Sequence, residues 1–482
     1  MRNYIIACVY LLQSVTVYGQ IDQSTEKWQD DIRFLQETMH HDYPFLFKKV
    51  TSQRFDREVE DLITRIPELE AHEITVGIAR LVSLFGYGHT RLWLMGWEKD
   101  NLFGFHQMPF NLYYFGEGIF IQGVHQQFET ALGAEVLEVE GMPILEAMEK
   151  IRPVVAVENE QFFKAYGINY LGTPEVLHAQ GIKTILDDKV TLTLKKQGKI
   201  FQQVFSPVDI KDYPLVYGLV QEGNSWLEAR AQGDDPYWLK NLEQIYYREF
   251  IPEYKTLYVR HSQIQDDSID IPTFYHQVFE FIAENDVEKL ILDVRLNGGG
   301  NNYKNKPIVT GIIACPEINQ SDKLFVILGR RTFSACQNLV NELDNYTNAT
   351  FVGEPTGENI NFYGDNTEVV LPNSKIPVRL SYAWWQDKPP WENAPWLAPN
   401  LAVDLSFQDY QSNHDPVLEA IFNYNIDSAT LDPMQYLTRL FRKGKQDQIF
   451  PEAQKLINDS RYRYYPFEQS FNQLGYQLIA TR

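Results

Sequence analysis

A chain of 482 residues is too long for one ordinary domain, so about two or three domains are expected. Hydrophobic residues make up 44% of the chain and aromatic residues 14%, which is enough to bury large cores. With 64 acidic against 43 basic residues the formal net charge is −21, which argues against nucleic acid or an anionic membrane as partner, because both require basic patches.

The N-terminus, residues 1–19, has the pattern of a signal peptide. Arg2 precedes a short apolar stretch, and Val17 and Gly19 fill the two small-residue positions before a cut after Gly19. A membrane anchor is the alternative, but this apolar stretch is too short to span a bilayer, and no later segment is long enough. We therefore expect an exported protein, periplasmic or extracellular, with no integral membrane segment.

Cys315 and Cys336 are the cysteines that would remain after cleavage. Two cysteines make neither a disulfide framework nor a zinc site, so buried free thiols are the default, and a single bridge stays open. The ten histidines show no H-x-H or H-E-x-x-H spacing. The sequence therefore predicts no metal and no cofactor.

Changes in pattern divide the chain into segments. Residues 20–100 carry apolar side chains at helical spacing and are predicted to form a helical domain. Residues 101–207 contain β-rich runs broken by glycine, which predict a small β-domain. A polar connection, residues 208–250, leads to residues 251–426, where strand and helix patterns alternate, and residues 427–482 are predicted to be a helical appendage. Alternating strands and helices imply a largely parallel sheet, so the fold class is α/β multi-domain.

A glycine-rich turn follows the predicted strand "KLILDVRL". It reads "NGGGNN", residues 297–302, and its consecutive glycines leave the N–H groups of Gly298 and Gly299 uncovered by side chains. Such N–H groups can bind a developing oxyanion. A plain glycine turn explains the same residues equally well.

Ser334 lies where the next predicted strand, "KLFVILG", gives way to the predicted helix "SACQNLVNELDNY". A serine at a helix start is more often an N-cap than a nucleophile. The two loops follow successive strands of one sheet, however, so the glycine turn can face Ser334, with the N–H of Ala335 as a further donor. A nucleophilic serine needs a base, and His89 in "LFGYGHTRLWL" is a candidate, although spacing alone does not place it near Ser334.

Four blocks of the sequence resemble the S41 peptidases, the tail-specific and tricorn-type serine peptidases and their retinoid-binding relatives. In chain order they are "FGYGHTRL", "LILDVRLNGGG", "GRRTFSACQNLV" and "TFVGEPTG", and the resemblance covers most of residues 72–424. It implies a PDZ-like β-domain, which "LGAEVLEVEGMPI" matches, a crotonase-like ββα catalytic domain and a catalytic serine at Ser334.

The family divides on the base that activates the serine. One branch uses a lysine in a block resembling G-E-K-T-x-G-K, but here "GEPTGEN" places Asn359 at that position, and an amide cannot accept the proton. The tricorn-type branch uses a histidine and a glutamate, which the resemblance assigns to His89 and to Glu392 in "WENAPWLAPN". Gly88 replaces that branch's serine and Tyr87 replaces a common aspartate, and an exposed loop carboxylate remains open as the alternative for Glu392.

Together these features predict an exported serine peptidase that hydrolyses short or unfolded peptides through an acyl-enzyme. Ser334 would attack the carbonyl, His89 would take its proton, and Glu392 would orient the imidazole. The backbone donors named above would bind the oxyanion. A homo-oligomer is left open. The alternative is a non-catalytic protein that carries a hydrophobic ligand on the same scaffold, and an acyl-CoA enzyme of the crotonase type is a more distant third.

Overall fold

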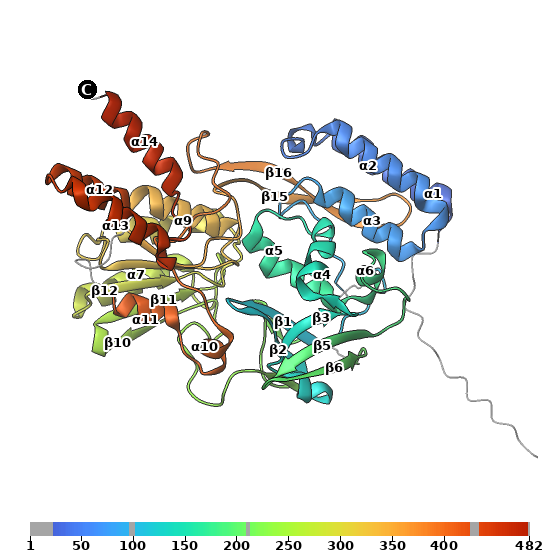
Figure 1. Ribbon diagram of the computed structural model, residues 1–482, viewed down its shortest axis with the longest axis horizontal. Coiled ribbons are helices and arrows are strands. Elements are labelled where there is room, and N and C mark those ends of the chain that lie inside the picture. Colours follow the sequence, from blue (N-terminus) through green and yellow to red (C-terminus); the bar gives the residue numbers. More distant parts are fainter. Residues whose placement is uncertain (1–22, 96–101, 209–212, 425–432, 481–482) are drawn as a thin grey trace, which may run out of the picture.

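The computed structural model describes residues 23–95, 102–208, 213–424 and 433–480. It is a mixed α/β fold with several sheets, in agreement with the predicted class. Figure 1 shows two bodies side by side, one with the N-terminal helices and an antiparallel sheet, the other with a parallel sheet. The predicted signal peptide lies outside the described residues. Within those residues every helix is too short or too polar to cross a bilayer.

Three helices begin the fold: α1 (Thr25–His41), α2 (Ser52–Arg65) and α3 (Ala71–Ser83). Each presents an apolar stripe at helical spacing, as Trp28, Ile32 and Leu35 do on α1, and buries it against the others. The hydroxyl of Thr51 accepts the N–H of Arg54 at 3.2 Å and so caps the start of α2. These helices agree with the pattern in residues 20–100.

The antiparallel sheet has seven strands, with the order β1-β2-β3-β5-β6, while β4 pairs with β3 and β9 with β2. The strands are β1 (Phe110–Phe115), β2 (Gly118–His125), β3 (Glu135–Val139), β4 (Met142–Pro143), β5 (Val190–Lys196), β6 (Lys199–Phe205) and β9 (Trp226–Glu228). A short hairpin, β7 (Leu215–Val216) with β8 (Leu219–Val220), lies between β6 and β9. Part of the predicted connection, residues 208–250, therefore belongs to this sheet.

Three short helices interrupt the predicted β-domain between β4 and β5: α4 (Ile144–Ile151), α5 (Glu160–Tyr166) and α6 (Pro174–Ala179). The sequence pattern of residues 101–207 did not indicate them, because helices of six to eight residues give little periodicity. α6 packs against α3. A single hydrophobic core contains Ile32 of α1, Leu192 of β5 and Phe333, so the helices and the sheet are packed as one body.

The second body is built on a six-stranded sheet in which β10 is antiparallel and the other strands are parallel. In spatial order the strands are β10 (Tyr246–Ile251), β11 (Thr256–His261), β12 (Lys289–Asp293), β13 (Leu324–Leu328), β14 (Thr350–Gly353) and β17 (Leu401–Ala402). Helices follow β11, β12 and β13: α7 (Ile271–Glu284), α8 (Lys306–Ile313) and α9 (Ala335–Tyr346). Crossovers of this kind were expected from the alternating pattern of residues 251–426.

Helices cover both faces of this sheet, which is why its strands are continuous apolar runs. Leu290 and Leu292 of β12 pack with α7, α8 and α9, whereas Ile291 between them belongs to the apolar cluster of the other face. That cluster includes side chains of α11 (Pro416–Phe422), α12 (Pro433–Arg442) and α13 (Gln446–Asn458). α12 and α13 lie within residues 427–482, so part of the predicted appendage contributes to the core of this body.

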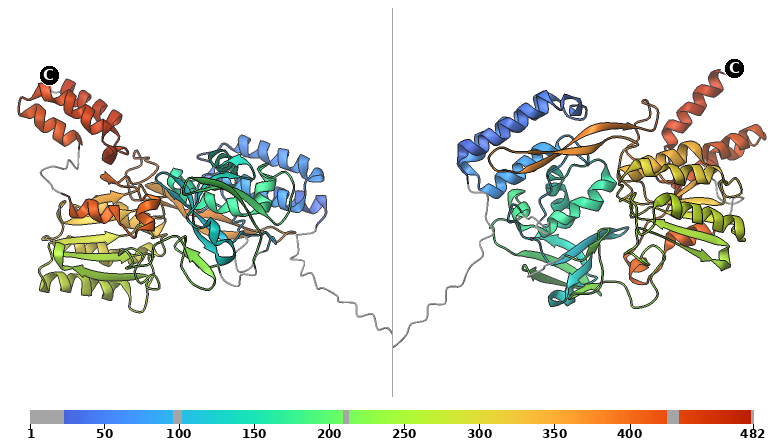
Figure 2. Two further views of the ribbon diagram at one scale, coloured as in Figure 1. Left: turned by 60° about the horizontal axis from the view of Figure 1, so that its bottom comes forward. Right: turned by 180° about the vertical axis from the view of Figure 1, so that it is seen from behind.

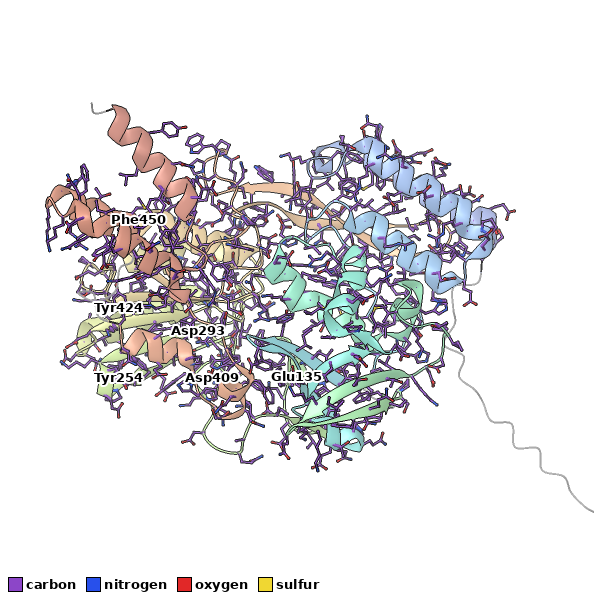
Figure 3. All side chains as sticks on the ribbon, in the orientation of Figure 1. Glu135, Tyr254, Asp293, Asp409, Tyr424 and Phe450 are labelled. Carbon is purple, nitrogen blue, oxygen red and sulfur yellow. The ribbon has the colours of Figure 1, made fainter. Side chains whose placement is uncertain are left out.

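The outer parts of the C-terminal helices remain exposed. Phe450 of α13, labelled in Figure 3, is 71% exposed. The last helix, α14 (Phe467–Ala480), projects from the body in Figures 1 and 2. A short helix, α10 (Phe407–Gln411), precedes α11 in the chain.

A long antiparallel ribbon, β15 (Asn361–Val370) and β16 (Pro377–Gln386), joins the two bodies. It leaves the parallel-sheet body and reaches the N-terminal helices, and all views in Figures 1 and 2 show it lying across them. At its far turn the buried carboxylate of Asp31 accepts the N–H groups of Asn373 at 2.7 Å and Ser374 at 2.8 Å. The ribbon is therefore fastened to α1 by a buried polar contact.

Removing the Asp31 carboxylate should detach the tip of the ribbon. Asp31→Ala leaves the N–H groups of half-buried Asn373 and buried Ser374 without acceptors, which is expected to lower the free energy of unfolding by about 2–3 kcal/mol. Urea denaturation measures this loss, and Asp30→Ala, at an exposed neighbour on α1, is the matched control. Equal stability of the two variants would show that the anchor contributes nothing.

Candidate active site

Ser334 lies on a strained turn directly between strand and helix. Its backbone has φ 56° and ψ −128°, a region that residues other than glycine rarely adopt, and its side chain makes no capping hydrogen bond to α9. An N-cap serine instead has an extended backbone and accepts an N–H of the first turn. A sharp, strained strand-to-helix turn is how nucleophile elbows expose their serine. The structure therefore favours a nucleophile over a cap.

The glycine turn after β12 lies against Ser334. Gly299 has φ +102°, and a Cβ on it would fall 2.6 Å from the Cβ of Ser334, so this contact requires glycine. The N–H of Gly299 donates to Asn297 Oδ1 at 2.9 Å and is therefore occupied. The N–H groups of Gly298 and Ala335 make no hydrogen bond to a described residue. Of the three predicted oxyanion donors, these two are free.

Asn297 joins the glycine turn to the serine loop. It is fully buried, its Nδ2 donates to the carbonyl of His261 at 2.8 Å, and its own carbonyl accepts the N–H of Phe333 at 3.1 Å. Together with the bond from the Gly299 N–H, Asn297 therefore makes three hydrogen bonds that hold the glycine turn in place. Sequence analysis gave Asn297 no role, because its hydrogen bonds depend on which loops meet in space.

His89 reaches the serine loop from the N-terminal body. It is buried on the turn that follows α3, and its ring stacks on that of Phe333, with the centroids 4.8 Å apart and the planes at 20°. Gly88 has no room for a side chain, since a Cβ there would fall 2.7 Å from the ring of Phe162 and 2.8 Å from that of Phe333. This packing explains the glycine that stands where the tricorn-type pattern has serine.

The carboxylate of Glu358 lies where His89 and Ser334 converge. It is fully buried, and its Oε2 accepts the N–H of Ser334 at 2.8 Å and lies 3.6 Å from His89 Nε2. Sequence analysis missed Glu358, which immediately precedes Asn359. A signal was present, because Glu358 lies in the loop after β14, just as the glycine turn and Ser334 lie in the loops after β12 and β13.

Glu392, the predicted orienting residue, lies in an exposed segment next to Trp391, which is 79% exposed. Its backbone N–H donates to the carbonyl of Pro389 at 2.9 Å, and its carbonyl accepts from Asn361 Nδ2 at 3.0 Å. Among the described ion pairs of His89, the carboxylate is that of Glu358. The geometry therefore favours Glu358 over Glu392 as the partner of the imidazole.

Burial controls the protonation of both groups. Loss of solvent lowers the pKa of His89 to about 3, with a smaller contribution from the charge of Arg91, so the imidazole is neutral and able to accept a proton. Burial also raises the pKa of Glu358 well above its usual value, and the neighbouring carboxylate of Glu158 raises it further. Glu358 Oε1 and His89 Nε2 have no hydrogen-bond partner among the described residues.

A second buried acid supports the histidine turn. Glu158 Oε2 accepts the N–H of Gly88 at 2.7 Å, and its Oε1 lies 3.3 Å from Lys49 Nζ. The next residue, Asn159, donates from Nδ2 to the carbonyl of Thr356 at 3.1 Å, in the loop that carries Glu358. The turn with His89 and the loop with Glu358 are therefore held by one short segment.

Cys315 and Cys336 are both buried and unpaired. The bridge between Cys315 and Cys336 that the sequence left open is absent from the structure, and burial raises the pKa of the Cys315 thiol to about 11. A thiol with so high a pKa is a poor nucleophile near neutral pH.

No protein-family model and no curated protein matches this sequence. Solved structures do match. A serine-to-alanine mutant of CPAF gives a TM-score of 0.56 at 10% sequence identity, over 85% of this chain and 99% of that chain. Mature CPAF complexed with lactacystin gives a TM-score of 0.55 at 11% identity, over 83% of this chain and 99% of that chain.

The fold is similar to that of CPAF. A putative S41 protease from Bacteroides fragilis also matches, at 13% identity over 66% of this chain and 82% of that chain, but its TM-score of 0.30 is too low to support an argument. At such low identity the likeness to CPAF concerns the fold alone, and the chemistry has to be argued from the side chains of the site.

The raised pKa of Glu358 predicts a stability that depends on pH. The fold favours the protonated carboxyl, so its stabilising contribution is complete below the pKa of an unfolded glutamate and is lost as pH rises through the higher folded pKa. Glu358→Gln cannot ionise and should therefore gain thermal stability relative to the parent protein as pH rises from about 5 to about 8.

Melting temperatures of both proteins across this pH range measure the effect. Glu392→Gln is the matched control, because that carboxylate lies in an exposed segment and its removal should leave the pH dependence unchanged. Parallel curves for Glu358→Gln and the parent protein would contradict a perturbed carboxyl at position 358.

Proposed function

We propose that this protein is a serine peptidase of the S41 type that cleaves peptide bonds through an acyl-enzyme. The observation that carries the proposal is the convergence of His89 and Ser334 on a single buried oxygen, Glu358 Oε2, from two different bodies of the fold. The strained backbone of Ser334 and the likeness of the fold to that of CPAF support it. The crotonase-like core and the PDZ-like domain remain what the sequence resemblance implies.

In the proposed reaction Ser334 Oγ attacks the peptide carbonyl while His89 takes its proton. The free N–H groups of Gly298 and Ala335 stabilise the oxyanion of the tetrahedral intermediate. His89 then returns the proton to the leaving amine, and water hydrolyses the ester formed on Ser334. The distance of 3.6 Å between His89 Nε2 and Glu358 Oε2 is long for a hydrogen bond, as is common before substrate tightens a site.

Glu358 takes the orienting role in this proposal. Its ionised form would hold the imidazole and stabilise the imidazolium that forms during attack, as a buried carboxylate does in a catalytic triad. The protonated form cannot stabilise a positive charge in this way. The reaction should therefore require deprotonation of a carboxyl whose pKa the fold has raised.

The substrate is proposed to be a short or unfolded peptide in the exported compartment that the N-terminal pattern indicates. Exposed aromatic side chains offer rigid contact area for it, among them Tyr303, which follows the glycine turn, and Trp384, which pairs with Tyr363 across the ribbon. The alternative of a hydrophobic carrier has no specific support. A carrier gives no reason for a strained serine that caps nothing and whose N–H bonds a buried glutamate beside His89.

A fluorophosphonate probe tests the nucleophile. The parent protein should be labelled and Ser334→Ala should not, while His89→Ala should react at least about 100-fold more slowly, because the general base is lost. Glu392→Gln should label at the parental rate, which controls for substitution of a carboxylate near the site. Absence of labelling in the folded parent protein, or equal labelling of Ser334→Ala, would overturn the proposal.

The pH dependence of labelling tests the role of Glu358. The rate should rise with pH through an apparent pKa above that of an ordinary glutamate, since ionised Glu358 supports the reaction and protonated Glu358 does not. If His89 alone controlled the rate, the rise would instead lie near pH 3, the value to which burial lowers its pKa. The Glu358→Gln variant should be labelled more slowly than the parent protein, and its labelling rate should lack the rise with pH that is assigned to Glu358.

A further inference from the structure

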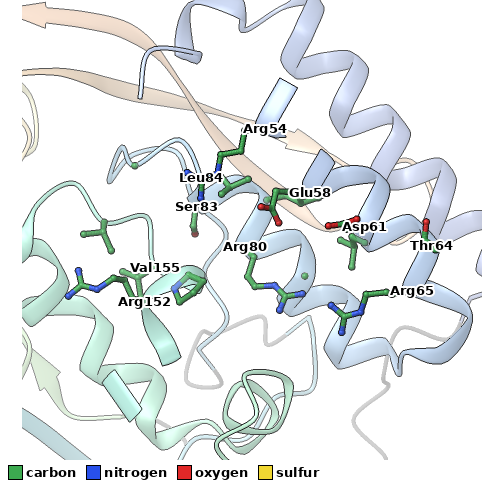
Figure 4. Close-up of a pocket in the computed structure, with 16 residues that line it drawn as sticks. Arg54, Glu58, Asp61, Thr64, Arg65, Arg80, Ser83, Leu84, Arg152 and Val155 are labelled. Atoms are coloured by element: carbon green, nitrogen blue, oxygen red, sulfur yellow. The ribbon is translucent and has the colours of Figure 1, made fainter. Parts of the chain in front are cut away.

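A cavity of about 780 Å³ lies in the N-terminal body, and its lining includes Gly86 and Val157, near the turn that carries His89. It is an open cavity bounded by α2, α3 and the segment after α4, and its lining includes none of Ser334, His89 and Glu358 (Figure 4). This volume is in the range of ordinary small-molecule sites. The residues that line the cavity indicate what it would bind.

Three arginines that line the cavity have no side-chain partner among the described residues: Arg54, Arg65 and Arg80. Arg65 at the end of α2 and Arg80 of α3 form no ion pair or hydrogen bond with a described residue. Burial lowers the pKa of Arg80 and the charge of Arg65 lowers it further, while the carboxylates of Glu58 and Glu73 act in the opposite direction. Arg152, by contrast, lines the same cavity but is held by Glu149 at 2.8 Å and Glu160 at 2.9 Å. Of the three unpaired guanidinium groups, those of Arg65 and Arg80 lie close enough together for their charges to interact, so these two can hold one anionic group between them.

A buried hydroxyl gives a second, independent indication of a ligand. Ser83 lines the cavity with only 8% of its surface exposed, and its Oγ has no hydrogen-bond partner among the described residues. In Figure 4 this hydroxyl points toward the segment that carries Arg152 and Val155. An unpaired buried hydroxyl costs free energy that a polar ligand group would recover.

The remaining lining residues narrow the class of ligand. Glu58 and Asp61 lie on the α2 wall, and their charges disfavour a multiply charged anion such as phosphate. Leu62, Leu81 and Val155 supply apolar surface that an inorganic ion could not use. Guanidinium groups match carboxylates in shape and charge. A single negative charge on an apolar body fits these constraints.

We propose that this cavity binds a small organic monocarboxylate. Its carboxylate is held by Arg65 and Arg80, its apolar body lies on the leucines, and the hydroxyl of Ser83 bonds a polar group on that body. Two sources share this chemistry: the free C-terminus of a short peptide, and a simple carboxylic acid. The site does not depend on the chemistry of Ser334.

Calorimetric titration of the purified protein tests the site, with N-acetyl-leucine as the probe. It should bind with a dissociation constant of about 1 mM or lower, and the neutral N-acetyl-leucinamide should bind at least about tenfold more weakly. If N-acetyl-leucine binds more strongly than hexanoate, the site is assigned to peptide C-termini. If the two bind equally, the site is assigned to simple carboxylic acids. Inorganic phosphate binding as tightly as N-acetyl-leucine would overturn the proposal.

Substitutions locate the binding. Arg65→Gln and Arg80→Gln should each weaken N-acetyl-leucine at least about tenfold, while Arg57→Gln, at an exposed α2 position outside the cavity, should leave it unchanged. If Arg80→Gln fails to fold, binding of N-acetyl-leucine to Arg65→Gln still tests the site, because Arg65 is exposed and its substitution should leave the fold intact. Unchanged binding in a folded Arg65→Gln variant, or equal binding of the amide, would overturn the site. The Ser334→Ala variant should bind normally, which separates this result from the proposed peptidase activity.

Discussion

The contact on which the site depends is the acceptance of the Ser334 N–H by the buried carboxylate of Glu358. This bond holds the strained turn of the serine against the loop after β14, and it places the same oxygen 3.6 Å from His89. A carboxylate without solvent is costly, and here a second buried acid, Glu158, lies close enough to raise its pKa further. The proposed chemistry needs a desolvated carboxylate at this position. Buried groups with perturbed pKa values and strained backbone are common at active sites.

The stacking of His89 on Phe333, next to Ser334, requires that the two bodies be held in fixed positions. The β15–β16 ribbon does this at one end through Asp31, and near the site the hydroxyls of Thr90 and Ser381 bond at 2.9 Å. Phe333, adjacent to the serine, belongs to the hydrophobic core of the N-terminal body. Because catalytic groups must be placed to within about half an ångström, such shared packing matters more than any single bond.

The parallel sheet was predictable because its strands are buried on both faces and therefore stand out as apolar runs. The helices α4, α5 and α6 were not, since each is too short to establish a period. The C-terminal helices illustrate a different limit. Their amphipathic pattern predicted helices, but only the structure shows that Leu437 of α12 and Leu456 of α13 join the apolar cluster on the second face of the sheet.

The sequence by itself determined the chemical groups of the candidate site: a glycine-rich turn and Ser334 at successive strand ends, and His89 between glycines. Only the tertiary structure decided which carboxylate lies beside His89, and that the N–H of Gly299 is occupied while those of Gly298 and Ala335 are free. The physical reason is that periodicity and motif spacing report local backbone geometry. The partner of a buried polar group depends instead on which distant loops the packing brings into contact.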